Sequence, residues 1–477
     1  MSTVRPAAPA ALSPRAWGAL LVLCSALFLD ALDVSMVGVA LPSIGSDLSM
    51  GPSQLQWIVS AYVLGYGGFL LLGGRAADLL GRRRMFLISL AVFAVASGLG
   101  AFVDDGSLLV ALRFIKGVSA AFTAPAGLSI ITTSFAEGAA RNRAISIYTA
   151  TGATGFSLGL VFGGVLTELG WRWVFFVPAP IALVTLIAAF RLVPDAGRVA
   201  GPRRSFDLGG ATAITAAMLL AVFTVVEAPD VGWASLRTIA SFAGVGALLA
   251  AFVALERRTA HPLVRLGIFR SVPLVRANIG AMALFGGWVG VQFIATLYMQ
   301  DVRGWSPLET GLAIFPGGLV VAIVAPRIGP LVGRFGVNRL IAAGLASTVA
   351  AYVLFLPIGI DSAYLTAILP TMLLVGVGFA LAYGPLNIAA TNGIAPEEQG
   401  LAGGLVNTSF QFGGALVLAV VAAVNNANAG PGGTPEDLLA GYEPAILVSV
   451  VAALIGVVAT VIPARLRPRP APAAERV

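Results

Sequence analysis

The chain contains apolar runs that are repeatedly long enough to cross a lipid bilayer. A membrane-spanning helix needs about 20 mostly apolar residues. Only 11% of the 477 residues are charged, whereas a soluble chain carries about 25%. The 57 glycines and 28 prolines suit membrane helices, in which small residues allow close packing and freed backbone groups find other partners. We therefore predict an all-α membrane protein with many spans.

The apolar runs predict fourteen transmembrane helices. The predicted spans are Trp17–Ala40, Leu55–Gly73, Met85–Val103, Leu108–Ser134, Ala144–Leu166, Trp173–Leu192, Leu208–Val226, Thr238–Leu255, Leu274–Met299, Thr310–Val332, Leu340–Leu356, Tyr364–Leu386, Leu401–Val424 and Ala445–Ile462. With both termini placed inside, 24 of the 29 Lys and Arg residues lie on the inner side and three on the outer side. Cytoplasmic loops are enriched in these residues. We therefore predict a multi-pass protein of the cell (inner, cytoplasmic) membrane with both termini in the cytoplasm. The formal charge of +7 is then a topology signal, and we expect no nucleic-acid partner.

A short pattern is repeated along the chain. Gly74, Asp78 and Gly81 follow the second span, and Gly329, Gly333 and Gly336 lie at a constant offset of 255 residues. Parallel repeats are one architecture of membrane transporters, although a chance match of glycines is the alternative. The predicted division is an N-terminal tail (1–16), a six-helix bundle (17–192), a linker with two extra transmembrane helices (193–273), a second six-helix bundle (274–463) and a C-terminal tail (464–477).

Four charged side chains lie deep inside the first and fourth predicted spans, away from their ends. Asp30 and Asp33 are three residues apart on one face of the first span, and Arg113 and Lys116 lie at a similar depth on the fourth. Four unpaired charges would cost about 10–14 kcal/mol on membrane-insertion scales. We therefore expect the acids and bases to pair across an internal cavity. The only histidine, His261, lies in a polar stretch between helices, so proton binding within the membrane falls to the carboxylates.

Four stretches resemble motifs of the major facilitator superfamily, in its fourteen-helix drug:proton antiporter family. They are LDVSMVGVALPSI in the first span, GRAADLLGRRR after the second, LLVALRFIKGVSAAFTAP in the fourth and GFSLGLVFGGVL in the fifth. The resemblance runs from about Trp17 to Ile462 and implies the major-facilitator fold, two six-helix bundles plus two additional helices, with transport by alternating access. Leu160 stands where the family has a proline that marks export, and Lys116 stands where it has glutamine. The missing proline keeps an importer or uniporter as an alternative.

The resemblance assigns roles to the embedded charges. It identifies Asp33 as the signature aspartate of the first span and Arg113 as a fourth-span arginine implicated in proton handling. We predict that Asp33 binds either a proton or the positive charge of the cargo, and that Asp30 is a second candidate acid. Lys116 is the only lysine and belongs to the same group, although it could instead reach toward the membrane surface. A static salt-bridge cluster between the first and fourth spans is the alternative.

The resemblance also implies a gate and a tight helix contact. The gate residues are Gly74, Arg75, Asp78, Gly81, Arg82 and Arg83, which would brace the two halves on the inner side, with Glu397 and Glu398 as partners for Arg75 or Arg82. A solvated charged loop is the alternative for this segment. The glycines of the fifth span are Gly155, Gly159, Gly163 and Gly164. Small residues at four-residue spacing allow two helices to approach closely, so this stretch predicts close packing that also limits leakage.

The cargo pocket needs aromatic and polar groups among apolar walls. Our candidates are Tyr62, Tyr66, Gln292, Asn407 and Gln411. The predicted function is proton-coupled export of amphipathic, cationic drugs or antibiotics by a monomer, with a carrier of a small polar metabolite as an alternative and a membrane receptor as a remote one. No Walker motif, nucleophile elbow, histidine cluster or metal-ligand spacing occurs in the sequence. We therefore expect a transporter driven by a proton gradient, with no cofactor and no enzymatic activity.

Overall fold

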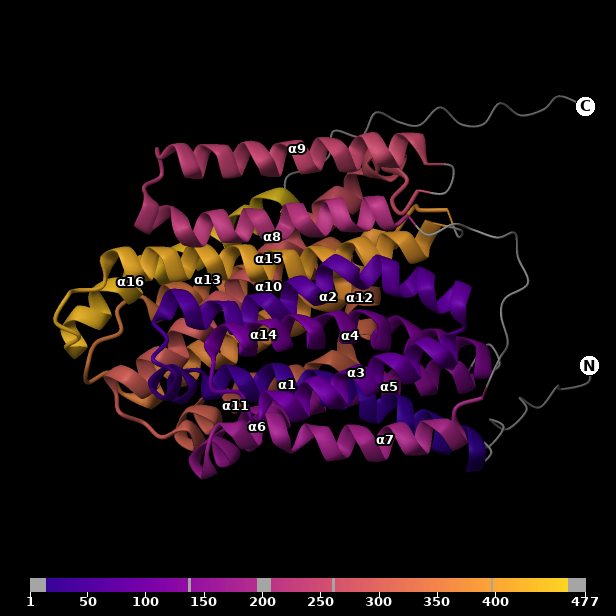
Figure 1. Cartoon of the computed structure of the whole chain (residues 1–477), viewed down its shortest axis with the longest axis horizontal. Helices are drawn as coiled ribbons and strands as arrows, with labels where there is room; N and C mark the ends of the chain where they lie inside the picture. The colour runs from indigo at the N-terminus through magenta and orange to yellow at the C-terminus, as the bar shows by residue number, and fades with distance from the viewer. Residues whose placement is uncertain (1–13, 136–138, 195–206, 260–261, 396–397, 462–477) are drawn as a thin grey trace, which may run out of the picture.

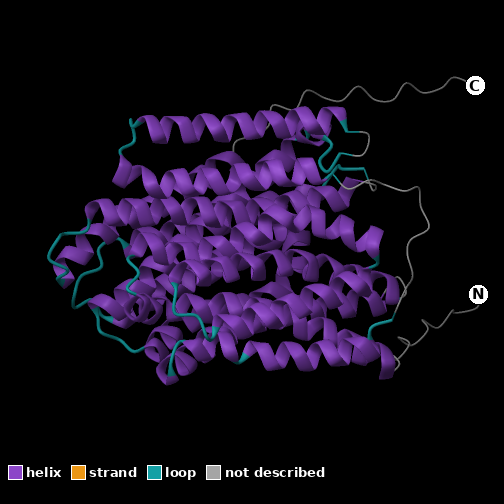
Figure 2. Cartoon of the chain, in the orientation of Figure 1, coloured by secondary structure: helices purple, strands orange, loops and turns teal. Residues whose placement is uncertain are grey.

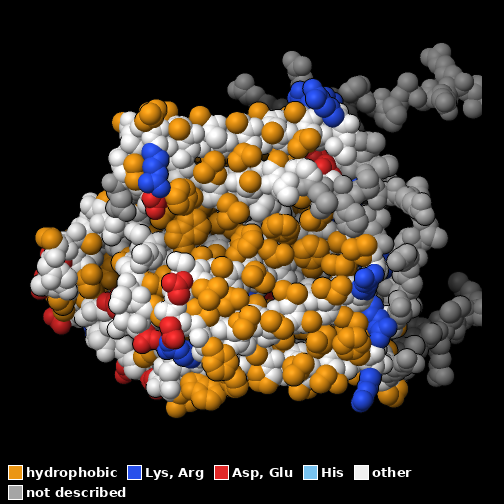
Figure 3. All heavy atoms as spheres, viewed as in Figure 1, with side chains coloured by type: hydrophobic (Ala, Val, Ile, Leu, Met, Phe, Trp, Pro, Cys, Tyr) orange, Lys and Arg blue, Asp and Glu red, His pale blue; other side chains and the backbone are white. Residues whose placement is uncertain are grey.

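The computed structural model describes residues 14–135, 139–194, 207–259, 262–395 and 398–461. These residues form helices joined by short loops, and no strand occurs among them (Figure 2). Fourteen of the described helical segments are long and apolar enough to cross a membrane, which confirms the predicted number. Apolar side chains dominate the middle of the face seen in Figure 3, as expected for a surface in contact with lipid.

The helices run roughly side by side along the long axis of the molecule (Figure 1). Their bounds are α1 Pro14–Leu48, α2 Pro52–Leu80, α3 Arg82–Gly100, α4 Gly106–Ser134, α5 Ala139–Leu169, α6 Arg172–Phe176, α7 Pro178–Leu192, α8 Leu208–Val231, α9 Leu236–Arg258, α10 Val272–Leu297, α11 Pro307–Val324, α12 Ile328–Phe335, α13 Val337–Phe355, α14 Leu369–Thr391, α15 Gln399–Asn428 and α16 Pro435–Val461. The short helices α6 and α12 belong to the same spans as α7 and α11, respectively. Pro178, at the first position of α7, lacks the N–H that would continue α6.

The two extra helices lie at one edge of the bundle. In Figure 1, α9 is the outermost helix and α8 lies beneath it. Helix α8 packs against α2 of the first half and α15 of the second half. The Thr215 hydroxyl donates a hydrogen bond of 3.1 Å to the Gly68 carbonyl of α2. The extra helices therefore contact both halves of the transporter.

The repeated glycine pattern marks two equivalent chain reversals. Gly81 separates α2 from α3 and Gly336 separates α12 from α13. Their φ angles are +101° and +82°, in the left-handed region that glycine adopts without a steric penalty. The segment between the predicted second and third spans is helical on both sides of Gly81, because α2 continues to Leu80 and α3 begins at Arg82.

The apolar core differs between the two ends of the bundle. We call the end at which α1 begins and α16 ends the terminal side. On the opposite side, one core contains residues of both halves, among them Val37, Ile58 and Val291. On the terminal side, Leu20 and Phe86 belong to one core, and a separate core collects residues of the second half, α8, α9 and Leu72 of α2. The two halves are thus joined most firmly on the side opposite the terminal side.

Several helices are longer than their apolar runs. Helix α1 ends at Leu48 instead of Ala40, and α2 ends at Leu80 instead of Gly73. The added turns carry polar or charged residues such as Asp47 and Arg75. Hydropathy does not reveal such turns, because a helix continues beyond the hydrocarbon layer without a break in backbone hydrogen bonding.

Candidate transport site

Asp33, Arg113 and Lys116 form a buried ion triad in the first half. Arg113 Nη1 donates to Asp33 Oδ2, and Lys116 Nζ donates to Asp33 Oδ1. All three side chains are at most 2% exposed. The predicted pairing of first-span and fourth-span charges is therefore correct for these three residues. Lys116 does not reach toward the membrane surface, which overturns that alternative.

Aromatic rings and a backbone carbonyl complete the surroundings of the triad. Arg113 Nε donates to the Ile58 carbonyl at 3.0 Å, and its guanidinium lies 4.5 Å from the ring centre of Tyr62. Lys116 Nζ lies 4.7 Å from the ring centre of Phe93. Cations over aromatic faces gain electrostatic stabilisation without water. The sequence analysis missed Phe93, because nothing in its apolar surroundings indicates that it faces a buried cation.

Close approach of α2 and α4 holds these groups at one depth. A Cβ atom on Gly117 would lie 2.0 Å from the Tyr62 carbonyl oxygen, and one on Gly65 would lie 2.5 Å from the Phe114 carbonyl oxygen. Only glycine fits at either position. The glycine of the fourth-span motif therefore brings Tyr62 over Arg113.

Asp30 stays outside the triad, contrary to the prediction that all four charges pair. Its side chain is 8% exposed, and its Oδ2 atom is buried with no hydrogen-bond partner in the described part of the chain. It lies within electrostatic range of Asp33 and Lys116 and of the hydroxyls of Tyr66 and Tyr148. Buried polar atoms are nearly always hydrogen-bonded. Within the described part of the chain, Asp30 Oδ2 thus lacks the hydrogen bond that a buried carboxylate oxygen usually has.

A cluster of aromatic side chains lies where the two halves meet. Trp288 of α10 contacts Phe156 of α5 in the first half, with ring centres 5.0 Å apart. The second half extends the cluster through Phe379 and Tyr383, whose rings stack at 5.1 Å. Tyr383 is 38% exposed although it lies within a span, and it lies near Tyr66. These rings provide an apolar wall where the two halves meet, and Tyr383 was not among the predicted pocket residues.

The five predicted pocket residues occupy two different environments. Tyr62 is buried against Arg113 and belongs to the triad. Tyr66, Gln292, Asn407 and Gln411 are half-buried. Gln292 faces Gly38 of α1, and its Oε1 atom has no hydrogen-bond partner among the described residues, whereas Asn407 donates to the Gly403 carbonyl at 2.8 Å. Tyr66, Gln292, Asn407 and Gln411 stay predicted pocket residues.

The glycines of α5 serve two contacts. Three of them, Gly155, Gly159 and Gly163, face α1. A Cβ atom added at these positions would lie 2.6, 2.1 and 2.7 Å, respectively, from the nearest atom of α1. Gly164 points to the other half, because its Cβ would lie 2.5 Å from Leu308 Cα. Facing it from α11, a Cβ on Gly311 would lie 2.2 Å from the Leu160 carbonyl oxygen. We call this contact, made by Gly164, Leu160, Leu308 and Gly311, the α5–α11 seam.

Replacing Gly311 with alanine is expected to stop transport while the protein still reaches the membrane. The added methyl group cannot fit against a backbone oxygen at 2.2 Å, so α5 and α11 must move apart and the seam no longer closes. The measurement is the efflux rate normalised to the amount of protein in the membrane. Gly329→Ala is the matched control, since a Cβ there meets nothing within 4 Å. Equal efflux by the two variants would contradict the role of the seam.

The predicted gate residues contact the first half and the linker. Arg82 donates to the Ser129 carbonyl at 3.4 Å, and Arg83 donates to the Phe190 carbonyl at 2.6 Å. Arg75 donates to the Pro262 carbonyl at 3.0 Å. Among the described residues, Glu398 forms its ion pair with Arg265, at 3.3 Å. The predicted pairing of Glu398 with Arg75 or Arg82 is therefore wrong. Glu397, His261 and the side chain of Asp78 lie outside the described residues.

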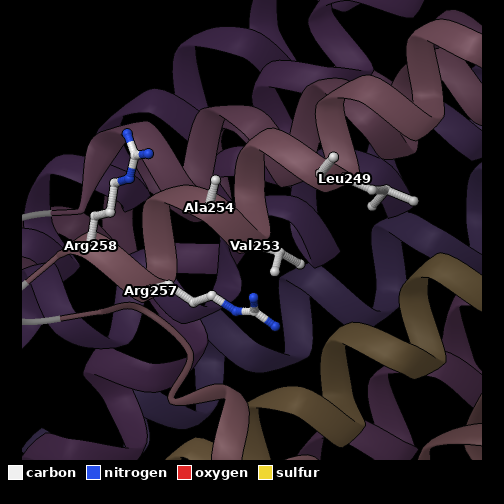
Figure 4. A pocket seen from close by; sticks show the side chains of 6 residues that line it. Leu249, Val253, Ala254, Arg257 and Arg258 are labelled. Carbon is white, nitrogen blue, oxygen red and sulfur yellow. The ribbon is translucent and has the colours of Figure 1, made fainter.

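A groove of about 530 Å³ lies on α9, away from the triad (Figure 4). It is lined by Leu249, Ala250, Val253, Ala254, Arg257 and Arg258. Only 11% of this span is buried inside the protein. The groove therefore belongs to the outer face of the bundle and not to the path between the halves.

Comparison with known proteins agrees with this arrangement. The sequence profile of the Major Facilitator Superfamily matches residues 23–418. The chain belongs to this superfamily. Cephamycin export protein CmcT of Amycolatopsis lactamdurans is 38% identical over 456 residues, which cover 95% of this chain and 93% of the relative. Puromycin resistance protein pur8 of Streptomyces alboniger is 35% identical over 454 residues, covering 92% and 89% of the two chains.

Solved structures of other transporters share the fold. A mutant of nucleoside transporter NupG has a TM-score of 0.66 at 13% identity, covering 92% of this chain and 99% of that one. A bacterial homolog of the human lysosomal transporter Spinster, in an inward-facing and unoccupied conformation, has a TM-score of 0.65 at 16% identity, covering 94% and 96%. The protein is thus a multi-pass membrane transporter of the major-facilitator fold and not an enzyme.

Proposed function

We propose that this transporter exports amphipathic, cationic compounds in exchange for protons. The names of its relatives, a cephamycin export protein and a puromycin resistance protein, support export of antibiotics or similar molecules. The aromatic cluster around Trp288 and Tyr383 supports a cargo with apolar rings. Exchange for protons is supported by Asp30, whose Oδ2 atom has no hydrogen-bond partner among the described residues.

The observation that carries the proposal is the different bonding of the two acids. Asp33 is bound by both cations, whereas Asp30 Oδ2 has no partner among the described residues. One carboxylate and two cations leave the triad with a net charge of +1. An ionised Asp30 balances this charge, and a protonated Asp30 does not. The assignment of the coupling acid therefore moves from Asp33, which the sequence favoured, to Asp30.

This charge balance makes proton and cargo compete. With Asp30 ionised, a cationic cargo near Tyr66 and Tyr383 meets a favourable carboxylate and two aromatic faces. Protonation of Asp30 removes that attraction and exposes the cargo to the positive triad, which promotes release. Exchange of one proton for a singly charged cation moves no net charge, so the pH difference drives it, and each pH unit supplies about 1.4 kcal/mol, enough for roughly a tenfold concentration ratio of cargo.

Alternating access would open the two sides in turn. The closed α5–α11 seam and the shared core on the opposite side suit a state with access from the terminal side. We propose that the terminal side faces the cytoplasm of a cell whose inner membrane holds the protein, and that the working unit is a monomer without a cofactor. Figure 3 supports this orientation, since much of the visible Lys and Arg lies at that end of the bundle.

Replacing Asp30 with asparagine is expected to lower pH-driven transport by at least tenfold while the purified protein stays folded. Asparagine keeps the shape of the side chain but neither ionises nor attracts a cation. The measurement is uptake of ethidium into proteoliposomes with an imposed pH gradient, alongside a neutral dye and an anionic dye. Asp361→Asn, outside the spans, is the control.

Two results would overturn the proposal. The first is an Asp30→Asn variant that responds to the pH gradient as the wild type does. The second is a wild type that moves the neutral and anionic dyes with the same pH dependence as ethidium, which would favour a carrier without charge selection.

A further inference from the structure

Two buried acids in the extra helices have no place in the transport pathway. Asp207 precedes α8 and is 5% exposed, and Glu256 lies in the last turn of α9 and is 4% exposed. Burying a carboxylate is costly unless hydrogen bonds satisfy it. The motifs of the sequence single out neither residue, so their burial needs another explanation.

Both acids bind the backbone of the segment that follows α9. Asp207 Oδ1 caps α8 by accepting from the Gly210 N–H at 2.7 Å, and its Oδ2 accepts from the Leu263 N–H at 3.4 Å. Glu256 Oε2 accepts from the Val264 N–H at 3.1 Å. The carboxylates converge over Gly210, where a Cβ would lie 2.8 Å from Glu256 Oε1 and 2.9 Å from Asp207 Oδ2. Two helices and a loop are thereby fixed at one point.

The same short segment holds a gate arginine. The Pro262 carbonyl accepts from Arg75 Nη1 at 3.0 Å. Next to it, Leu263 and Val264 are 7% and 3% exposed and belong to the core that contains Leu72 of α2 and residues of the second half. The segment 262–264 therefore binds Arg75 of α2 and packs in a core that α2 shares with the second half.

We propose that Asp207 and Glu256 are positioning residues of the gate. They hold segment 262–264 so that its carbonyl fixes Arg75, and the extra helix pair becomes a clasp between the end of α2 and the second half. The clasp consists of Asp207, Glu256 and residues 262–264. The proposal depends on alternating access but not on protons or on the charge of the cargo.

The charges around the clasp support a positioning role over simple anchoring. Two charged residues lie near Glu256, namely Asp207, which precedes α8, and Arg75 of α2. Arg265, which follows residues 262–264, is paired with Glu398. The Oε1 atom of Glu256 is buried without a partner among the described residues. An apolar anchor would avoid the desolvation cost of such an atom, so the carboxylate is retained where it orients the backbone.

Hydrogen–deuterium exchange of the full-length protein in nanodiscs tests the clasp without any cargo. In Glu256→Ala, we expect faster exchange of the amides of residues 262–268 and, through Arg75, of residues 72–84. Glu256→Gln, which keeps the side-chain volume and one acceptor oxygen, should restore most of the protection. Glu227→Gln is the matched control, because Glu227 lies at the other end of α8 in an exposed pair with Arg237 at 3.2 Å.

A double-mutant cycle ties the clasp to transport. Ethidium efflux by Glu256→Ala and by Arg75→Ala should each fall about tenfold, and the double variant should be no slower than either, because both remove the same contact. Exchange changes confined to residues 256–268, or efflux losses that multiply in the double variant, would overturn the proposal. Should Glu256→Ala fail to fold, Asp207→Asn replaces it in both experiments with the same criteria. The exchange experiment uses no pH gradient, so its failure is separate from failure of proton coupling.

Discussion

Replacing Asp33 with asparagine is expected to destabilise the folded transporter by about 3–5 kcal/mol, the range seen when one partner of a buried ion pair is removed. Asp33 is 0% exposed and is the shared acceptor of Arg113 and Lys116. Asparagine would leave two cations in the protein interior without their counter-charge. The measurement is the free energy of unfolding of the purified protein during a titration with sodium dodecyl sulfate.

An exposed ion pair provides the control for this loss. Asp47 accepts from Arg172 at 2.7 Å, and the two side chains are 48% and 38% exposed. Exposed pairs contribute about 0–1 kcal/mol. Asp47→Asn should therefore lower the free energy of unfolding by less than about 1 kcal/mol. The double variant with Asp33→Asn and Lys116→Gln should recover part of the loss, because one unpaired cation is removed. Equal losses for the two single variants would contradict a triad that stabilises the fold.

Depth along a helix could be predicted from sequence, whereas side-chain direction could not. Counting residues from the ends of the spans placed Asp30, Asp33, Arg113 and Lys116 at one level, and the structure brings three of them together. Residues three apart differ by only about 60° around a helix axis. The sequence alone therefore does not show which aspartate faces α4. Our prediction favoured Asp33 as the coupling acid, but Arg113 and Lys116 neutralise its charge.

The contacts between halves show the same limit. Gly164 follows Gly163 directly, so the motif grouped them, but successive residues point about 100° apart on a helix. Gly163 packs on α1 and Gly164 on α11. Likewise, Glu256 and Asp207 stand 49 positions apart in the printed chain, and each resembles a charge at the end of a span. Only the folded chain shows that they meet over Gly210.

Replacing Lys116 with glutamine, the residue usual at this position in the family that the sequence resembles, is expected to tighten binding of a cationic cargo. The substitution leaves an Asp33–Arg113 pair that is still satisfied, but the triad loses its net positive charge. A unit charge at roughly 10 Å contributes about 1.7 kcal/mol at an effective dielectric constant of 20. Removing that repulsion should lower the Kd for ethidium about 18-fold and leave the Kd for a neutral dye nearly unchanged.

The tighter binding should come with slower proton-driven turnover. In the wild type, protonation of Asp30 leaves the embedded charges at +1, so a bound cation is repelled. In Lys116→Gln, protonation only brings the embedded charges to zero, and the cation loses an attraction without gaining a repulsion. We expect the efflux rate at saturating ethidium to fall severalfold, with Arg172→Gln, an exposed arginine outside the triad, as the control. If Lys116→Gln changed the Kd values of cationic and neutral dyes alike, Lys116 would act through packing against Phe93 and Phe175 and not through its charge.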